Sequence, residues 1–241
     1  MLLRLPTSVS EAQRCLAEGA VPIGGATLVW ATWQRDGFPE QAMSLRELPE
    51  ATVVERELLG GAVVLNELDD RMPQVLRRAA ATVGTGAVRR TATVGGNIVG
   101  STLRCLLPPA LVLGARATVL ETDRVRETDL AEVLAKRHLI LSLRWRDPIV
   151  SGYRKLDAEA GGPPPLVVAS AVHAGDDGGP RSLRVAVRDG YEVVSDGVTG
   201  EGGTRQVLDA LRTTAVGTLH PTAWDAVSEQ VTDVLARAAN G

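Results

Sequence analysis

The chain contains the stretch Arg89-Arg90-Thr91-Ala92-Thr93-Val94-Gly95-Gly96-Asn97-Ile98, in which a hydroxyl, two glycines and an amide follow one another. It belongs to a glycine-rich segment, residues 84–97, that lacks the apolar period of a helix or strand, so we predict a loop there. A second glycine pair lies in Ile23-Gly24-Gly25-Ala26-Thr27-Leu28, between a predicted strand at 21–23 and a predicted helix at 26–33. Such a turn presents backbone N–H groups and a positive helix end to an anion. Two such loops can hold the two phosphates of a dinucleotide, although a tight turn alone also explains either glycine pair.

Composition excludes several classes of protein. The 241 residues are 44% hydrophobic and 23% charged, with a net charge of −3, which is ordinary for a globular protein and lacks the basic surplus of a nucleic-acid binder. No apolar run approaches the roughly 18 residues of a membrane span, and residues 1–6 lack the apolar core of a signal peptide. We therefore expect a cytoplasmic protein.

Metal and redox chemistry are restricted by the side chains present. Two cysteines and three widely separated histidines are too few for a structural zinc site or an iron–sulfur cluster held by this chain alone. We predict no metal ligands and no catalytic residues, because neither paired carboxylates nor a Ser-His-Asp arrangement can be identified. Neither glycine loop has the spacing of a P-loop or a Rossmann fingerprint. Difficult redox chemistry would therefore require an organic cofactor of another kind.

The apolar periodicity predicts a mixed α+β architecture with a boundary near residue 150. Residues 1–150 contain the glycine-rich segments, and residues 151–241 read as strands followed by helices. The predicted helices are 9–18, 72–83, 106–114, 129–134, 204–212 and 221–239. The predicted strands are 41–45, 52–55, 58–64, 116–121, 138–145, 149–156, 166–173, 182–188 and 192–194.

Taken in order, these motifs resemble the FAD-binding (medium) subunit of the molybdenum hydroxylases, the family of the xanthine dehydrogenase and carbon monoxide dehydrogenase flavoproteins. Residues 23–28 look like the family's A-G-G-T-D-L, residues 44–50 like its D-L-x-x-I-P-E-L, and residues 89–98 like its R-N-x-A-T-V-G-G-N-L. The resemblance covers nearly the whole chain. It implies a PCMH-type FAD-binding domain of two subdomains over residues 1–150, followed by a small C-terminal domain of antiparallel sheet plus helices over residues 151–241.

The resemblance implies FAD as the cofactor and assigns contacts to it. The first glycine loop would hold the pyrophosphate through its N–H groups, and Thr93 to Asn97 would form a second clamp. Val83 and Leu141 would pack near the flavin or adenine. Lys155, one of two lysines beside 24 arginines, would stabilise the reduced flavin, unless it is a solvated surface lysine. The expected contact residues are Ile23, Gly24, Gly25, Ala26, Thr27, Leu28, Val83, Thr93, Gly95, Gly96, Asn97, Thr102, Leu106, Leu141 and Lys155.

Two departures from the family pattern affect this expectation. Thr27 stands where the family has an aspartate, and Leu106 replaces a second aspartate in the loop that begins near Thr102. Each lost hydrogen bond to a ligand is worth about 0.5–1.5 kcal/mol. FAD has many other contacts, so we expect weakened binding or a changed flavin environment.

Three functions follow. In the first, the chain is an oxidoreductase subunit that passes electrons between a molybdenum-binding large subunit with a 2Fe-2S small subunit and an acceptor such as NAD or a quinone. In the second, it is a free-standing FAD-dependent oxidase or dehydrogenase that acts directly on a small molecule. In the third, it is a degenerate, FAD-poor scaffold. The absence of metal ligands in the sequence favours the first function.

Overall fold

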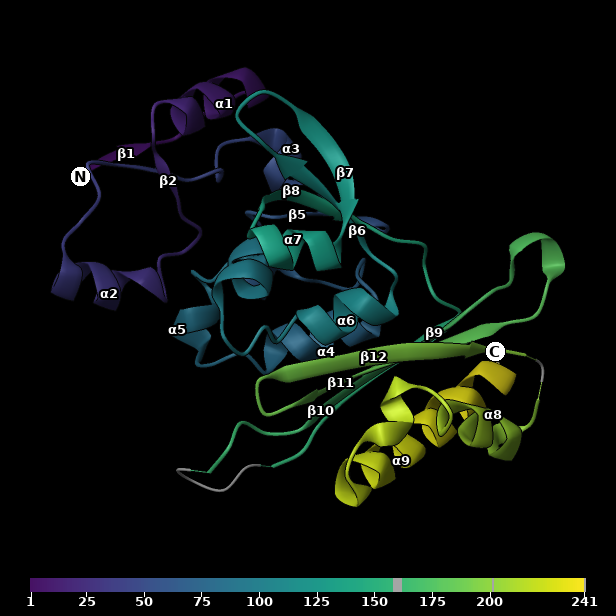
Figure 1. Ribbon diagram of the computed structural model, residues 1–241. Coiled ribbons are helices and arrows are strands. Elements are labelled where there is room, and N and C mark those ends of the chain that lie inside the picture. The colour runs from purple at the N-terminus through teal and green to yellow at the C-terminus, as the bar shows by residue number, and fades with distance from the viewer. Residues whose placement is uncertain (158–161, 201, 241) are drawn as a thin grey trace. The chain divides into compact units, whose positions relative to one another are not determined.

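The computed structural model describes residues 1–157, 162–200 and 202–240 (Figure 1). The chain is a mixed α+β protein that divides into two compact units. Unit 1 consists of Met1–Met72, Ala80–Leu106 and Ala115–Trp145. Unit 2 consists of Pro73–Ala79, Leu107–Gly114 and Arg146–Gly241. Two short segments from the first half of the sequence thus belong to the unit that the C-terminal residues form.

Unit 1 begins with a three-stranded parallel sheet of order β1-β3-β2. Helix α1 (Val9–Ala17) starts at Ser8, whose Oγ accepts a hydrogen bond from the N–H of Glu11 at 3.3 Å. The helix buries Cys15 against this sheet in a cluster that includes Met43. Helix α2 (Val29–Asp36) buries no residue and begins three residues later than predicted. The strands are β1 (Leu2–Arg4), β2 (Val21–Pro22) and β3 (Gln41–Met43).

The second sheet of unit 1 is antiparallel, with the order β4-β5-β8-β6-β7. Its edge strand β7 (Val125–Asp129) was not predicted from the sequence, because it is mostly exposed and carries polar side chains instead of an apolar alternation. Residues 49–52 form a helical turn, α3 (Pro49–Thr52), which includes Thr52, the first residue of the strand predicted at 52–55. The remaining elements are β4 (Val54–Glu55), β5 (Leu58–Gly60), β6 (Arg116–Leu120), α7 (Leu130–Lys136) and β8 (Leu139–Arg144).

The glycine-rich segment contains more regular structure than predicted. Helix α5 (Gly86–Arg89) starts at Thr85, whose hydroxyl accepts from the N–H of Val88 at 3.3 Å. A π-helical turn spans Gly96–Gly100. A local cap and short-range hydrogen bonds stabilise these turns. Such interactions do not require a regular repeat of apolar residues, so the sequence pattern did not predict the turns. The preceding elements are a 3-10 turn at Leu65–Glu67 and α4 (Gln74–Ala81).

Unit 2 contains an antiparallel sheet of order β12-β11-β10-β9 with helices α8 and α9 against it (Figure 1). Helix α9 spans the predicted residues and buries Trp224, Val227 and Val231 against the sheet. Strand β12 ends at Thr199, five residues after the predicted end. It is a half-exposed edge strand that contains polar residues, so its second half lacks the apolar pattern from which strands are predicted. The elements are α6 (Leu107–Val112), β9 (Val150–Lys155), β10 (Val167–His173), β11 (Ser182–Asp189), β12 (Glu192–Thr199), α8 (Thr204–Leu211) and α9 (Pro221–Ala239), with 3-10 turns at Asp176–Gly178 and Ala215–Thr218.

No helix in the described part of the chain combines the length and apolar character needed to cross a bilayer.

Candidate functional site

Both glycine loops line one cavity of about 360 Å³ in unit 1. This volume is at the lower end of the range for ligand pockets in proteins, about 300–1,000 Å³. Most of the residues expected from the sequence to contact a cofactor are among its walls. These are Ile23, Gly24, Gly25, Ala26, Thr27, Leu28, Val83, Thr93, Gly95, Gly96 and Asn97.

The two loops pack directly against each other, and this contact explains the first glycine pair. A Cβ atom on Gly25 would lie 1.6 Å from the carbonyl oxygen of Thr91, and one on Gly24 would lie 2.2 Å from Oγ1 of Thr93. Neither glycine has a positive φ; in this loop Ala26 does, at 55°. A tight turn alone therefore does not explain Gly24 and Gly25. A side chain is excluded at Gly25 by the backbone of Thr91 and at Gly24 by the side chain of Thr93.

The first loop carries the hydrogen-bond donors. The N–H of Ile23 donates to the carbonyl of Met43 at 2.8 Å. The N–H groups of residues 24–28 make no hydrogen bond with any described residue. Their loop borders the cavity and precedes α2, so these donors and the helix end have the polarity that a phosphate requires.

The second loop is internally bonded and offers less to a ligand than the sequence suggested. The N–H of Gly95 donates to the carbonyl of Gly61 at 2.8 Å, that of Gly96 to Thr93 Oγ1 at 3.2 Å, and that of Asn97 to the carbonyl of Thr93 at 2.9 Å. These bonds give the wall of the cavity its shape. A ligand would meet the Thr93 and Asn97 side chains here, while most of the backbone N–H groups would come from the first loop.

Leu106 does not line the cavity; it is fully buried. Its N–H donates to Oδ1 of Asn97 at 2.8 Å, so its backbone orients the amide that does line the cavity. Thr102 is exposed and also lies outside the cavity wall. The position at which the family has an aspartate therefore supports Asn97 in this chain, and its side chain packs in the core.

Strand β8 turns Leu141 away from the cavity. Leu141 packs in the cluster with Cys15 and Met43 and is not among the residues that line the cavity. Its neighbours Leu139 and Ile140 do line the cavity, and the pairing of β8 with β6 is irregular at Leu141, because Val119 pairs with Ile140 and Thr118 with Ser142. A contact between Leu141 and the cofactor stays a prediction.

Lys155 lies in unit 2, near the end of β9, where it pairs in register with Val167 of β10. A role for Lys155 beside the flavin stays a prediction.

Sequence reasoning missed three polar residues of the cavity wall, Ser101, Arg137 and His138. Arg137 terminates α7 in the left-handed conformation, with φ 53° and ψ 43°. Its guanidinium makes no ion pair or hydrogen bond with a described residue, and no aspartate or glutamate is among the described residues that line the cavity. Little in the sequence indicated this role. The sequence showed only that an arginine follows the predicted helix at 129–134 near a position where glycine is common.

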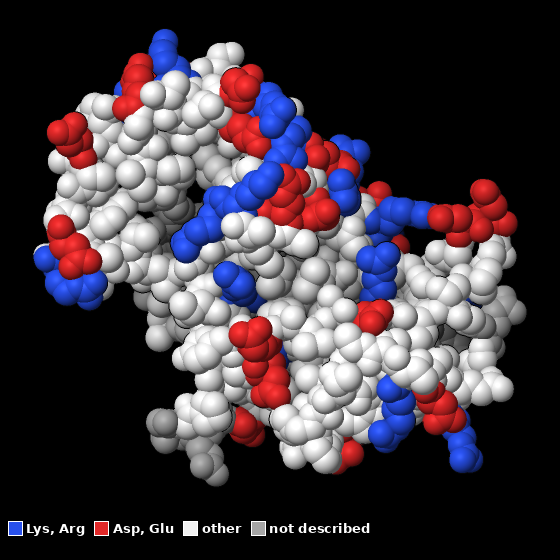
Figure 2. All heavy atoms as spheres, in the orientation of Figure 1, with Lys and Arg blue, Asp and Glu red and all other residues white. Residues whose placement is uncertain are grey.

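A network of charged side chains holds His138 at the edge of the cavity. Arg126 donates to both carboxylate oxygens of Glu132, at 3.1 and 2.9 Å, and its Nη2 lies 3.1 Å from Nε2 of His138. An arginine can only donate, so Nε2 of His138 is the acceptor in this contact. Glu132 also accepts from Lys136 at 2.7 Å and from the Thr128 hydroxyl. Figure 2 shows basic and acidic side chains gathered over the region of β7 and α7.

The hydrogen bonds from Arg126, Lys136 and Thr128 hold the pKa of the Glu132 carboxyl well below its usual value. The same contact with Glu132 raises the pKa of Arg126. Both groups therefore remain charged at neutral pH, and the network fixes the end of α7 from which Arg137 projects.

A family model described as the FAD binding domain in molybdopterin dehydrogenase matches residues 3–142. The chain belongs to this family. The matched range contains both glycine loops, Val83 and the cavity-lining residues 137–140. A search of curated proteins found no match.

The cofactor of this FAD-binding domain is FAD. The residues that line the cavity fit such a group. The N–H groups of residues 24–28 and the guanidinium of Arg137, which bond to no described residue, can donate hydrogen bonds to phosphate oxygens. None of the described residues that line the cavity is a carboxylate that would repel a phosphate. Ile140 and Val83 provide apolar wall for a ring system. Among the residues that the structure describes, no group of three His, Cys, Asp or Glu side chains is placed to hold a metal ion.

Proposed function

We propose that the chain is an FAD-holding electron-transfer subunit, with the pyrophosphate of FAD at the N–H groups of residues 24–28. Arg137 supplies a positive charge to the same phosphates, and Thr93 and Asn97 contact the cofactor from the second loop. The observation that supports this most is the cavity itself, because residues 24–28 and Arg137 line the same space and neither these N–H groups nor the guanidinium bonds to a residue that the structure describes.

When bound, FAD accepts and releases electrons, and the protein provides its position and electrostatic surroundings. Direct oxidation of an organic substrate also needs a general base to take a proton. The cavity wall holds no carboxylate among the described residues, and Nε2 of His138 faces a guanidinium. This shortage of bases favours electron relay over direct substrate oxidation.

The proposed partners are a molybdenum-binding large subunit and a 2Fe-2S small subunit, and the proposed acceptor is NAD or a quinone. We retain the sequence-based division into an FAD-binding domain of two subdomains at 1–150 and a C-terminal domain at 151–241. We also retain a cytoplasmic location and a role for Lys155 near the flavin. Family membership and the absence of metal ligands from the sequence support this assignment.

The first experiment is an absorption spectrum of the purified chain, before and after addition of FAD, with a sizing column in parallel. We expect flavin bands at about 370 and 450 nm, as for any oxidised flavin, with about one FAD per chain. A protein that remains colourless and takes up no FAD would overturn the proposal and leave the scaffold function.

A second experiment separates the two flavoprotein functions. The tagged chain is isolated from its native cells, and molybdenum and iron are measured in the eluate. Molybdenum and iron that co-elute with the yellow chain support the subunit role. A yellow, metal-free protein of one kind of chain that a small organic molecule reduces directly would establish the free-standing enzyme.

A further inference from the structure

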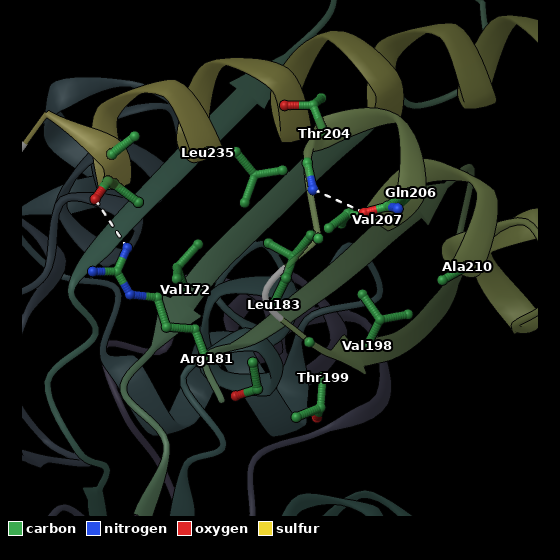
Figure 3. A pocket seen from close by; sticks show the side chains of 16 residues that line it. Val172, Arg181, Leu183, Val198, Thr199, Thr204, Gln206, Val207, Ala210 and Leu235 are labelled. Carbon is green, nitrogen blue, oxygen red and sulfur yellow. Dashed lines mark hydrogen bonds between the residues drawn. The ribbon is translucent and has the colours of Figure 1, made fainter. Parts of the chain in front are cut away.

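The apolar walls of the two cavities are held in different ways. The cavity of unit 2, about 610 Å³ in volume, is lined by Val172 and Leu183, which project from the sheet toward helices α8 and α9 (Figure 3). These two residues pair across β10 and β11, so the strand ladder fixes their positions. The cavity of unit 1 is lined by Val83 and Val88, of which Val83 lies outside any helix or strand. An interaction of another kind must hold this part of its wall.

Arg89 supplies that interaction. Its Nη1 donates to the carbonyl oxygen of Val83 at 3.0 Å and to that of Gly84 at 2.9 Å. No N–H group of the described backbone donates to either carbonyl, and Val83 is only 9% exposed. A backbone carbonyl with little access to water is unfavourable without a donor. The guanidinium therefore stabilises a bend whose carbonyl groups the backbone itself leaves unpaired.

The position of Arg89 in the sequence explains how it closes this bend. Gly84, at the bend, has a φ of +46°, and helix α5 begins two residues later. Arg89 is the last residue of α5, so its side chain ties the end of the helix to the chain that precedes it. Val83 and Val88 line the cavity from within this closed segment. Without the Arg89 bonds, the local cap of α5 would still hold Val88, and Val83 would be released.

We propose that Arg89 is a positioning residue for the cofactor, which fixes the bend at Val83 and thereby the apolar wall against which a ring system of FAD packs. The identity of the cofactor rests on the proposed function. Arg89 is not among the residues that line the cavity, so it acts through Val83 and not by contact with FAD. Both bonds come from one nitrogen atom, so a single ammonium group on a flexible side chain can replace them.

The test compares Arg89→Met, which removes the donor, with Arg89→Lys, which keeps one. Arg90→Met is the matched control, because it removes the same charge from the next position. Arg90 is exposed and makes no side-chain hydrogen bond or ion pair with a described residue. Arg89→Gln, whose shorter side chain does not reach the two carbonyl groups, replaces Arg89→Met if that variant does not fold.

FAD affinity and flavin accessibility are measured at a temperature at which every FAD-free variant is fully folded. In Arg89→Met we expect FAD affinity to fall about tenfold, and the fluorescence of the bound flavin to become more accessible to quenching by iodide. Arg89→Lys should restore affinity to within about twofold of the parent chain and restore the quenching. Arg90→Met should change neither quantity.

Hydrogen exchange of residues 82–92 in the FAD-free chain provides a measurement that does not depend on the cofactor. Exchange should be faster in Arg89→Met than in the parent chain and unchanged in Arg90→Met, because local opening follows the loss of local bonds. Unchanged exchange in Arg89→Met would overturn the role of Arg89 in the bend.

Three other results would also overturn the proposal. They are faster exchange in Arg89→Met with FAD affinity and iodide quenching unchanged, equal losses of affinity in Arg89→Met and Arg90→Met, and no rescue by Arg89→Lys. A parent chain that takes up no FAD would overturn the proposed function and the part of this proposal that concerns FAD. The exchange measurement would then still support or exclude the bonds that hold the bend, so the two failures are distinguishable.

Discussion

At the scale of single residues, Arg137 combines backbone strain with a charge that pairs with no described residue, at the wall of the cavity in unit 1. A non-glycine residue in the left-handed region costs of order 1–3 kcal/mol, which persists where other interactions determine the conformation. The position ends α7, where glycine is the usual residue. Under the proposed function, the conformation places at the cavity wall a guanidinium that has no acidic partner among the described residues and can pair with the FAD phosphates.

Arg137→Gly should therefore separate stability from binding. We expect the free energy of unfolding of the FAD-free variant to exceed that of the parent chain by roughly 0.5–1 kcal/mol, because the strain is removed. We expect its FAD affinity to fall about tenfold, with a weaker dependence on salt. Chemical denaturation and flavin fluorescence titration measure the two quantities.

The matched control is Asp177→Gly, which relieves a similar strain at φ 51° on a turn of unit 2. It should gain stability without any change in FAD affinity. Unchanged FAD affinity in Arg137→Gly would remove Arg137 from the proposed phosphate site.

Gly25 gives the second prediction at this scale. Gly25→Ala would place a methyl group 1.6 Å from the Thr91 carbonyl oxygen, an overlap that only movement of the backbone can relieve. We expect a loss of unfolding free energy of about 3 kcal/mol or more, together with loss of FAD uptake. In Gly100→Ala the new methyl group has open space around it and φ is not positive, so this control should change stability by less than about 1 kcal/mol. Similar stabilities for the two variants would show that the loops do not pack as described.

At the scale of elements, the charged network joins strand β7 to helix α7. Glu132 has a lowered pKa because it accepts hydrogen bonds from Arg126, Lys136 and Thr128. A carboxyl whose pKa is lower in the folded than in the unfolded state stabilises the fold above its unfolded pKa, and loses that contribution as the pH falls through the folded pKa.

Glu132→Gln should therefore lower the thermal unfolding midpoint at pH 7, and the deficit relative to the parent should shrink progressively below about pH 5. Thermal unfolding followed by circular dichroism from pH 7 to pH 3 measures this. Glu127→Gln, which disrupts an exposed pair with Arg116, should have little effect at any pH, since surface pairs contribute about 0–1 kcal/mol. A deficit for Glu132→Gln that is the same at pH 7 and pH 3 would contradict the assigned network.

At the scale of the whole molecule, each of the two units has its own cavity and its own apolar core. A ligand that binds only the folded state stabilises it by RT ln(1 + [L]/Kd), which is about 2.7 kcal/mol at a hundredfold excess over Kd. FAD should accordingly slow hydrogen exchange in residues 20–30 and 90–100 more than in β10 and β11. Mass spectrometry of exchanged peptides measures this difference. Equal protection of both sets would place the FAD site elsewhere.

Much of the candidate site was predictable because glycine pairs in a sequence indicate loops that can approach another backbone or a ligand closely. The glycine pairs at 24–25 and 95–96 marked the two loops that line one cavity, and the family pattern around them identified FAD. The periodicity of residues 221–239 predicted α9, since a helix that buries one face repeats its apolar residues every three to four positions. The period of α9 depends on local geometry, and each glycine motif is a short run of neighbouring residues, so both could be recognised in the sequence even though the packing of the two loops is a tertiary contact.

The tertiary structure decided which residues line the cavity. The run Leu139-Ile140-Leu141 is apolar throughout, so only the folded chain reveals that Leu139 and Ile140 line the cavity and that Leu141 packs in the core. The N–H groups of the second loop are occupied by Thr93 and Gly61, a partner 34 residues away from Gly95. Arg137 reaches the cavity because α7 ends beside it in a left-handed residue. Strand phase, long-range hydrogen bonds and helix ends depend on contacts between segments far apart in sequence, and one-dimensional periodicity does not record them.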